Sequence, residues 1–107
     1  MFLIAYGYKF RYDSPIELTV YNKVFKTFHE ASNYLIKEII PKDYWYSDLL
    51  KAIREEKRNF YTKYEECYYI NYDWGKGDKK YPKTIYTNCS GSNEYCGDTW
   101  TIFRINE

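Results

Sequence analysis

The sequence contains a single histidine, His29, and this scarcity removes most histidine-based metal sites and any mechanism that needs two imidazoles. It also lacks the phosphate-binding glycine-rich loop, the dinucleotide-binding fingerprint and the motifs of zinc proteases and serine hydrolases. No apolar run reaches the roughly 18 residues that a membrane-spanning helix needs. We therefore expect no metal, no cofactor, no catalytic motif and no contact with a membrane.

Aliphatic residues are few, because Leu, Ile, Val and Phe together make up only about a fifth of the chain, near the level at which highly charged chains stay disordered. Here the 16 basic and 15 acidic residues nearly cancel, so that charge repulsion does not oppose collapse. Aromatic residues supply the missing apolar area, since they make up 22% of the sequence and each ring can bury roughly 150–250 Å². The 107 residues predict one domain, 1–107, with an aromatic core.

The net charge of +1 argues against strong, sequence-independent binding to duplex DNA, which depends on many neutralised phosphates. The apolar N-terminus lacks the basic segment and the small-residue cleavage site of a secretory signal, so we expect a cytoplasmic protein. A small Tyr- and Lys-rich domain without catalytic motifs is typical of accessory proteins of viruses and mobile elements.

The first part of the chain predicts a β-hairpin. Residues 2–12 alternate, with apolar side chains such as Ile4 and Tyr6 at the even positions, which is typical of a half-buried strand. A turn signal follows at 13–15, and the alternation resumes over 16–20. Two such segments separated by a turn indicate antiparallel pairing.

Two helices are expected next. Thr27 and Glu30 match the capping-box pattern, which predicts a helix over residues 27–40, closed by the following proline. Ser47 is a good N-cap for a second helix, which we expect to run to about Tyr61.

The rest of the chain favours strands over residues 64–74, 84–87 and 99–105. The last of these has apolar side chains on both faces, which indicates a central strand. The predicted order is ββααβββ. We therefore expect an α+β fold in which a twisted antiparallel sheet carries two helices packed on one face.

The cysteines are the remaining candidates for metal or nucleophilic chemistry. Cys67, Cys89 and Cys96 do not form the closely spaced pairs of a zinc site. A Cys89–Cys96 disulfide would close a short loop, but a reducing cytoplasm disfavours it. A Cys–His nucleophile would need His29 beside a cysteine, which a sequence cannot show. We therefore favour a non-enzymatic protein and keep a small Cys/His enzyme as the weaker alternative.

Aromatic residues interleaved with cations form a first candidate site around the start of the second helix. Tyr, Trp and Arg are the residue types that most often anchor protein interfaces. The site predicts a protein partner, whose surface this domain would occupy as an inhibitor or accessory subunit does. Its residues are Tyr44, Trp45, Tyr46, Lys51, Arg54 and Arg58.

A second candidate site surrounds the lysine-rich segment 76–83. Aromatic rings stack on bases with roughly 1–3 kcal/mol each, and lysines attract phosphates. This pattern predicts the alternative function, binding or sequestration of a nucleotide or a single-stranded nucleic acid. Its residues are Tyr72, Trp74, Lys76, Lys79, Lys80 and Tyr81.

Both hypotheses assume that this small domain has more aromatic rings than its core can hide. The alternative is that most tyrosines are core or sheet residues with their hydroxyls in water. The strand order stays open at this point, and an exposed sheet edge would allow two copies to pair as a homo-oligomer.

Overall fold

The structure, a computed structural model, describes residues 1–9, 17–40, 46–62, 67–74, 80–88 and 97–105. The strands within these ranges are β1 (Phe2–Lys9), β2 (Glu17–Val20), β3 (Asn59–Tyr61), β4 (Cys67–Trp74), β5 (Lys80–Asn88) and β6 (Gly97–Arg104). The helical segments are α1 (Phe28–Tyr34), the π-helical turn η1 (Leu35–Ile39) and α2 (Tyr46–Arg54). The turn predicted at 13–15 lies outside the described residues.

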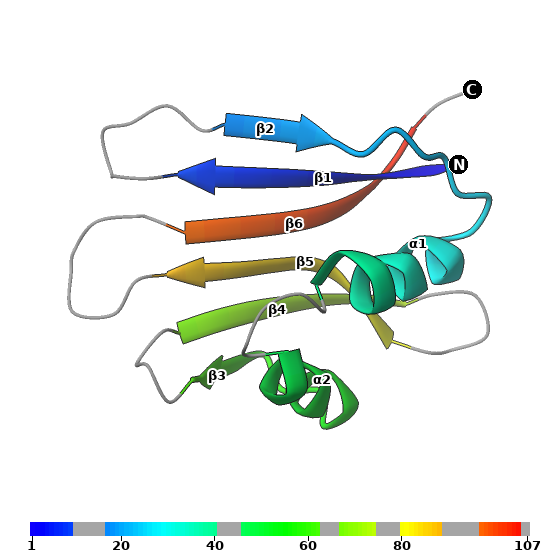
Figure 1. Ribbon diagram of the computed structural model, residues 1–107. Helices are drawn as coiled ribbons and strands as arrows, with labels where there is room; N and C mark the ends of the chain where they lie inside the picture. The colour runs from blue at the N-terminus through cyan, green and yellow to red at the C-terminus, as the bar shows by residue number, and fades with distance from the viewer. Residues whose placement is uncertain (10–16, 41–45, 63–66, 75–79, 89–96, 106–107) are drawn as a thin grey trace.

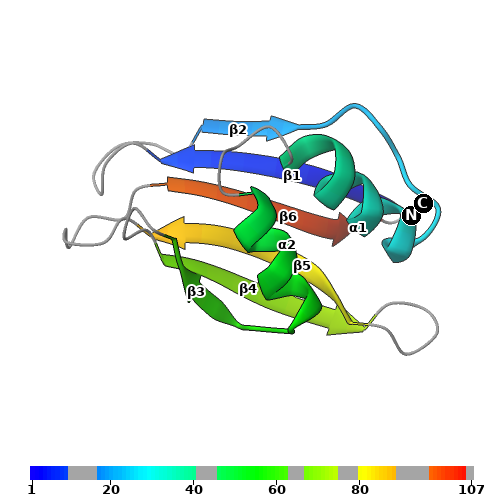
Figure 2. The same cartoon turned by 60° about the horizontal axis from the view of Figure 1, so that its bottom comes forward.

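The strands form one antiparallel sheet in the order β2-β1-β6-β5-β4-β3 (Figure 1). The helical segments lie on the same side of this sheet (Figure 2). The predicted α+β fold is therefore confirmed, with its antiparallel sheet and its helices on one face. β6 lies between β1 and β5, so the closing strand is central, as predicted. The sheet has one strand more than the predicted order, because β3 falls where the sequence indicated helix.

Alternation in β1 places its even-numbered side chains beneath the helices. Ile4 is fully buried, and Tyr6 pairs with Trp100 of β6, with their ring centroids 5.6 Å apart. The Tyr6 hydroxyl donates a hydrogen bond to the Asp98 carboxylate. Burial, followed by this bond, raises the pKa of Tyr6 above its usual value. The hydroxyl is thus held neutral in a contact that ties β1 to β6.

The core lies between the sheet and the helices and draws on almost every element. Its members are buried apolar side chains. The two-residue period of the strands and the spacing of apolar residues in the helices place these side chains between the two layers. They are Ile4, Phe25, Ala31, Leu35, Ile40, Leu49, Ala52, Tyr68, Ile70, Ile85, Trp100 and Ile102.

The first helix begins where the sequence predicts it. Thr27 adopts an extended conformation, and its Oγ1 accepts a hydrogen bond from the Glu30 backbone N–H at 3.1 Å. Beyond Tyr34 the helix widens into η1, where the Ile40 N–H donates to the carbonyl of Leu35 five residues earlier. This wider turn aligns the side chains of Leu35 and Ile40, and both are fully buried.

The second helix is shorter than predicted, because it ends at Arg54 and does not continue to about Tyr61. Glu56 takes a left-handed conformation with φ of 53°. The Glu56 N–H donates to the Ile53 carbonyl at 3.1 Å, and the next N–H donates to Ala52 at 2.9 Å. This pair of bonds is the Schellman ending that satisfies the last helical carbonyls, normally with glycine at the left-handed position. The sequence gives no signal of it, because the residue there is a glutamate.

The chain after this turn forms β3, which pairs with the start of β4. Phe60 stacks on Tyr68 with ring centroids 5.4 Å apart and an angle of 18° between the planes. Phe60 falls within the range of the predicted second helix. The structure buries the same ring through a cross-strand contact instead, so the side chain is turned toward the core although the element differs.

β5 spans nine residues where the sequence indicated a strand over 84–87. Its pairing with β4 shifts register at Asn71 and Tyr72, so that Pro82 lies opposite Tyr72. A bulge of this kind accommodates a proline within a strand, since the ladder hydrogen bond that proline cannot make is interrupted there. Pro82 and the flanking lysines obscure the alternation on which the prediction relied.

Candidate binding site

Residues from both predicted sites meet in two adjoining hollows beyond the end of α2. The larger hollow, about 470 Å³, lies between α2, η1 and the paired ends of β4 and β5, and it is lined by Ile36, Ile53, Arg54, Glu56, Trp74, Lys80 and Tyr81. The smaller, about 200 Å³, shares Glu56, Trp74 and Lys80 and adds Arg58, Ile70, Asn71 and Tyr72. We refer to the two hollows and their lining residues as the Trp74 site.

Trp74 is the most prominent side chain of this site. It ends β4, lies opposite Lys80 in the sheet register, and remains 60% exposed. The Lys80 ammonium lies 5.1 Å from the centroid of the indole and 3.7 Å from a Glu56 carboxylate oxygen. The cation–π contact and the ion pair order the lysine beside the ring. The indole is thus held in place while more than half of it faces solvent.

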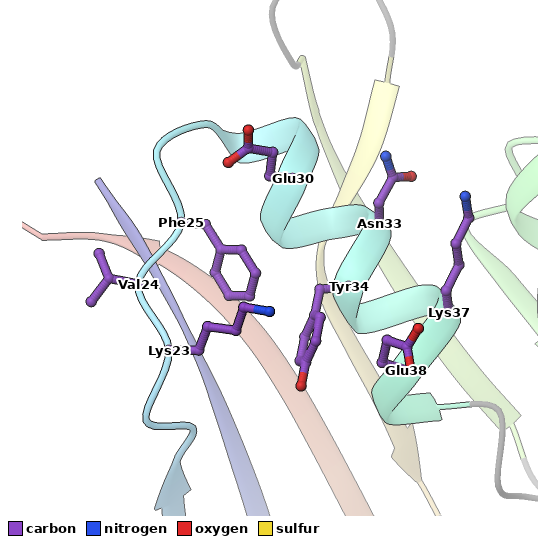
Figure 3. Close-up of a pocket in the computed structure, with 8 residues that line it drawn as sticks. All are labelled: Lys23, Val24, Phe25, Glu30, Asn33, Tyr34, Lys37 and Glu38. Carbon is purple, nitrogen blue, oxygen red and sulfur yellow. The ribbon is translucent and has the colours of Figure 1, made fainter.

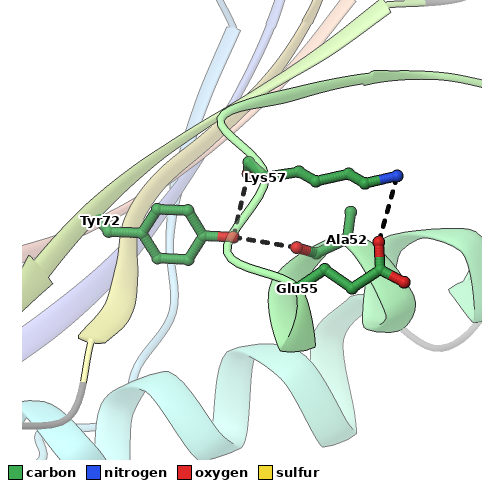
Figure 4. Close-up of polar contacts among 4 residues, drawn as sticks. All are labelled: Ala52, Glu55, Lys57 and Tyr72. Atoms are coloured by element: carbon green, nitrogen blue, oxygen red, sulfur yellow. Dashed lines mark hydrogen bonds and ion pairs between the residues drawn. The ribbon is translucent and has the colours of Figure 1, made fainter.

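The turn that ends α2 is tied to β4 by the hydroxyl of Tyr72 (Figure 4). Tyr72 Oη lies 3.2 Å from the carbonyl oxygen of Ala52 and 3.0 Å from that of Lys57, and its proton is available to either acceptor. Lys57 also pairs with Glu55, with 3.1 Å between Nζ and Oε2. Burial, with a smaller contribution from the Glu56 carboxylate, raises the pKa of Tyr72 to about 12. Tyr72 therefore positions the turn on which Glu56 and Arg58 are carried.

Tyr81 connects the site to α1. Its half-buried ring meets Phe28 edge-on at 6.0 Å and His29 at 4.8 Å between centroids. The His29 ring in turn lies 2.8 Å, Nε2 to Nδ2, from the Asn33 amide. The histidine considered for catalysis is thus engaged in packing and a hydrogen bond at the border of the candidate site.

The basic residues of the first predicted site do not form one helical row. Lys51 and Arg54 are exposed on α2, but Arg58 lies beyond the Schellman turn, where its carbonyl accepts from the Ile70 N–H at 2.7 Å. A helix running to about Tyr61 would have carried all three, but α2 ends at Arg54. Arg54 and Arg58 nevertheless line the two hollows from either side of Glu56. The Trp74 site therefore combines Arg54, Arg58 and Lys80 with one carboxylate.

Several predicted residues have no described position. Tyr44, Trp45, Lys76 and Lys79 lie outside the described residues, as do Cys89 and Cys96. The backbone of Tyr46 forms the first residue of α2. Within the described ranges the structure therefore brings Tyr72, Trp74, Lys80 and Tyr81 together with Arg54 and Arg58. Glu56 was missed, because only the tertiary structure shows where the turn projects it.

A further hollow of about 430 Å³ lies between the segment before α1 and the outer side of α1 and η1 (Figure 3). Its rim carries Lys23 and Lys37 against Glu30 and Glu38. The Lys23 ammonium already lies 4.4 Å from the ring centroid of Tyr34. Because its two lysines are balanced by two carboxylates, this hollow offers less net charge to a ligand than the Trp74 site, where three cations accompany one carboxylate.

Within the described ranges, no group of three or more His, Cys, Asp or Glu side chains is placed to hold a metal ion. Among the same residues, no helix is long and apolar enough to cross a bilayer. Comparisons with protein-family models, curated proteins and solved structures return no match for this chain.

Proposed function

We propose that this protein is a small non-enzymatic binding protein that occupies a surface of a protein partner through the Trp74 site, as an inhibitor or accessory subunit does. The observation that carries the proposal is the exposed indole of Trp74 beside a hollow lined by Ile36 and Ile53. An aromatic anchor next to an apolar recess, with arginines around it, is the composition of an interface hot spot.

The charges of the site favour a particular partner chemistry. Arg54, Arg58 and Lys80 outnumber the Glu56 carboxylate, and both arginines are exposed. An apolar side chain of the partner would enter the recess, while carboxylates on either side of it would meet the cations. Such charge matching speeds association and fixes the register of the two surfaces.

The alternative, capture of a nucleotide or a single strand, is supported by the contact between Lys80 and the Trp74 ring, because stacking platforms for bases combine rings with cations. One feature makes it the weaker proposal. The lysine approaches the ring at 5.1 Å, where a stacked base would have to displace it.

The indole N–H signals of the three tryptophans provide a direct test by NMR. The signal of Trp74 is the one that disappears in Trp74→Ala. The probes are synthetic peptides with one Leu or Phe between acidic residues, the same peptides with Lys in place of Asp and Glu, AMP, and an oligothymidylate. We expect only the acidic peptides to shift the Trp74 signal. In addition, Trp74→Ala should weaken their binding by at least about 30-fold, which corresponds to the roughly 2 kcal/mol of a hot spot.

The matched control is Tyr61→Ala, which removes another exposed aromatic ring on β3, outside the Trp74 site, and should leave peptide binding unchanged. Arg54→Glu should weaken binding of the acidic peptides several-fold, since an exposed ion pair contributes about 0.2–1 kcal/mol and the reversal adds repulsion. A response to AMP or the oligonucleotide without one to the peptides would support the alternative. No response of Trp74 to any acidic peptide at millimolar concentration would exclude the proposal.

We also propose that the protein acts in the cytoplasm. The free thiol of Cys67, which lies buried in β4, is consistent with a reducing compartment. A cytoplasmic location is compatible with the proposed role of a non-enzymatic accessory protein.

A further inference from the structure

The face of the sheet opposite the helices, which we call the open face, is covered by none of the described residues (Figures 1 and 2). The register places Leu18 and Val20 of β2 on this face, where they are 72% and 54% exposed. At the other side of the same face, Tyr61 of β3 is 71% exposed and Tyr86 of β5 is also exposed. One side of the open face is therefore aliphatic and the other is rich in tyrosine.

The open face carries little charge. The side chains that the register places between these two sides are mostly uncharged, such as Ala5, Phe103 and Thr101. Most charged residues of the same strands fall on the helix side, where Asp98 binds Tyr6 and Arg104 lies over the ring of Phe2. Lys9, at the end of β1, holds an open-face position opposite Gly97. Among the described residues of these strands, Asp73 and Lys83 lie beyond the register shift at Asn71.

Because the open face has few charged residues, charge matching restricts the kinds of partner that it can bind. Nucleic acids and anionic lipid surfaces are held by clusters of lysine and arginine, and an acidic or basic protein surface would meet little countercharge here. A second copy of the same face introduces no like-charge repulsion when a two-fold axis brings identical patches together. Charge matching therefore favours self-association over these other partners.

The size of the open face reaches what a stable dimer needs. β1, β4 and β6 have eight residues each and β5 has nine. At about 3.3 Å per residue and 4.8 Å between strands, these four strands cover roughly 500 Å², and the short strands at the edges add roughly 100 Å². Two copies would bury roughly 1,200 Å² in total, at the lower end of the range for stable interfaces.

We propose that two copies of this protein pack open face against open face as a β-sandwich. A two-fold axis running along the central strands places the aliphatic side of one copy on the tyrosine side of the other. Leu18 and Val20 of β2 then meet Tyr61 on β3 of the second copy, and Tyr86 of β5 packs over the central strand β6 of the second copy. The exposed apolar groups of both copies are thereby buried. The sheets lie about 10 Å apart, as in sandwich domains. The Trp74 site stays accessible, because it lies on the helix side.

The test is the mass in solution, measured by sedimentation equilibrium at protein concentrations on the order of 100 μM, above the micromolar Kd expected of an interface this small. We expect the wild type to be a dimer. Tyr86→Lys and Val20→Lys should both be monomers, because each would bury two unpaired charges in the interface. Circular dichroism melts establish that both variants fold.

The matched control is Val24→Lys. Val24 is the same residue type, is 51% exposed, and lies in the segment before α1 rather than on the open face. This variant should remain dimeric. A monomeric wild type would overturn the proposal, as would a Tyr86→Lys variant that stays dimeric. If Val20→Lys alone dissociates the dimer, the copies pair through the β2 edge, because Tyr86 lies on an interior strand.

Discussion

At the scale of single residues, the Trp74 site depends on one unusual backbone conformation. Glu56 holds a left-handed φ that costs a residue with a Cβ roughly 1–2 kcal/mol relative to glycine. The conformation directs its carboxylate toward Lys80 and lets the chain reverse toward β3. A residue held in such a conformation persists only where the surroundings enforce it, and here the Tyr72 hydroxyl and the Schellman bonds do so.

Removal of the Tyr72 hydroxyl tests this account. Tyr72→Phe should lower the free energy of unfolding at neutral pH by about 1 kcal/mol, the usual net contribution of one hydrogen bond. The measurement is urea unfolding followed by circular dichroism. Tyr61→Phe, which removes an exposed hydroxyl, is the control and should change stability little. Equal stability of wild type and Tyr72→Phe would show that the hydroxyl does not hold the turn.

The same residue predicts a pH dependence. Burial raises the pKa of Tyr72 from 10.0 to about 12, so its neutral form is favoured in the folded state. The resulting stabilisation is fully present below pH 10 and is lost as the pH rises from 10 toward 12. Other tyrosines also titrate there, so the informative quantity is the stability difference between wild type and Tyr72→Phe. We expect this difference to shrink through that interval, and a constant difference would contradict the assignment.

At the scale of elements, β3 is a three-residue strand at the sheet edge and has little intrinsic stability. It is held by its pairing with β4 and by the stacking of Phe60 on Tyr68. Because β3 follows directly from the turn that carries Glu56 and Arg58, loss of β3 would also release one wall of the Trp74 site.

Phe60→Ala should therefore affect both stability and binding. We expect the free energy of unfolding to fall by about 2 kcal/mol, less than for a fully buried phenylalanine because the ring is only half-buried. Amide hydrogen exchange in residues 59–61 should rise. The control is Tyr61→Ala, because Tyr61 is the next residue in β3 but is 71% exposed. Both variants are compared at protein concentrations too low for dimers to form. Unchanged exchange in Phe60→Ala would mean that the backbone pairing alone holds the strand.

At the scale of the whole molecule, the two proposed surfaces face in opposite directions. The Trp74 site lies on the helix side of the sheet, and the open face lies on the other. A dimer built on the open face would present two Trp74 sites outward, so that a partner with two binding segments would gain avidity without any new contact.

This separation predicts that the two functions are independent. Tyr86→Lys should abolish the dimer yet leave the peptide response of the Trp74 indole signal unchanged. Trp74→Ala should abolish the peptide response yet leave the mass that of a dimer. Sedimentation and the NMR titration are performed on the same samples. Loss of both properties in either variant would indicate that the surfaces are coupled or that the variant is misfolded, which the melting curve distinguishes.

Local patterns in the sequence determined much of the fold. Alternation fixed which side chains of β1 and β4 face the core, Thr27 fixed the start of α1, and the apolar closing strand indicated its central place. These features follow from contacts near in sequence or from the period of the element itself. The α+β class and the placement of the helices on one face follow from them.

Only the tertiary structure decided where α2 ends and which residues form the Trp74 site. The glutamate at the left-handed position carries no local signal, since the turn is held by Tyr72 from a strand far along the chain. Arg54 and Arg58 meet Trp74 and Lys80 because the turn and the bulge at Pro82 bring separate strand and helix ends together. Such long-range contacts arise only when the whole core is packed. Local sequence patterns therefore specify the helices and strands, whereas the composition of the binding surface depends on the tertiary structure.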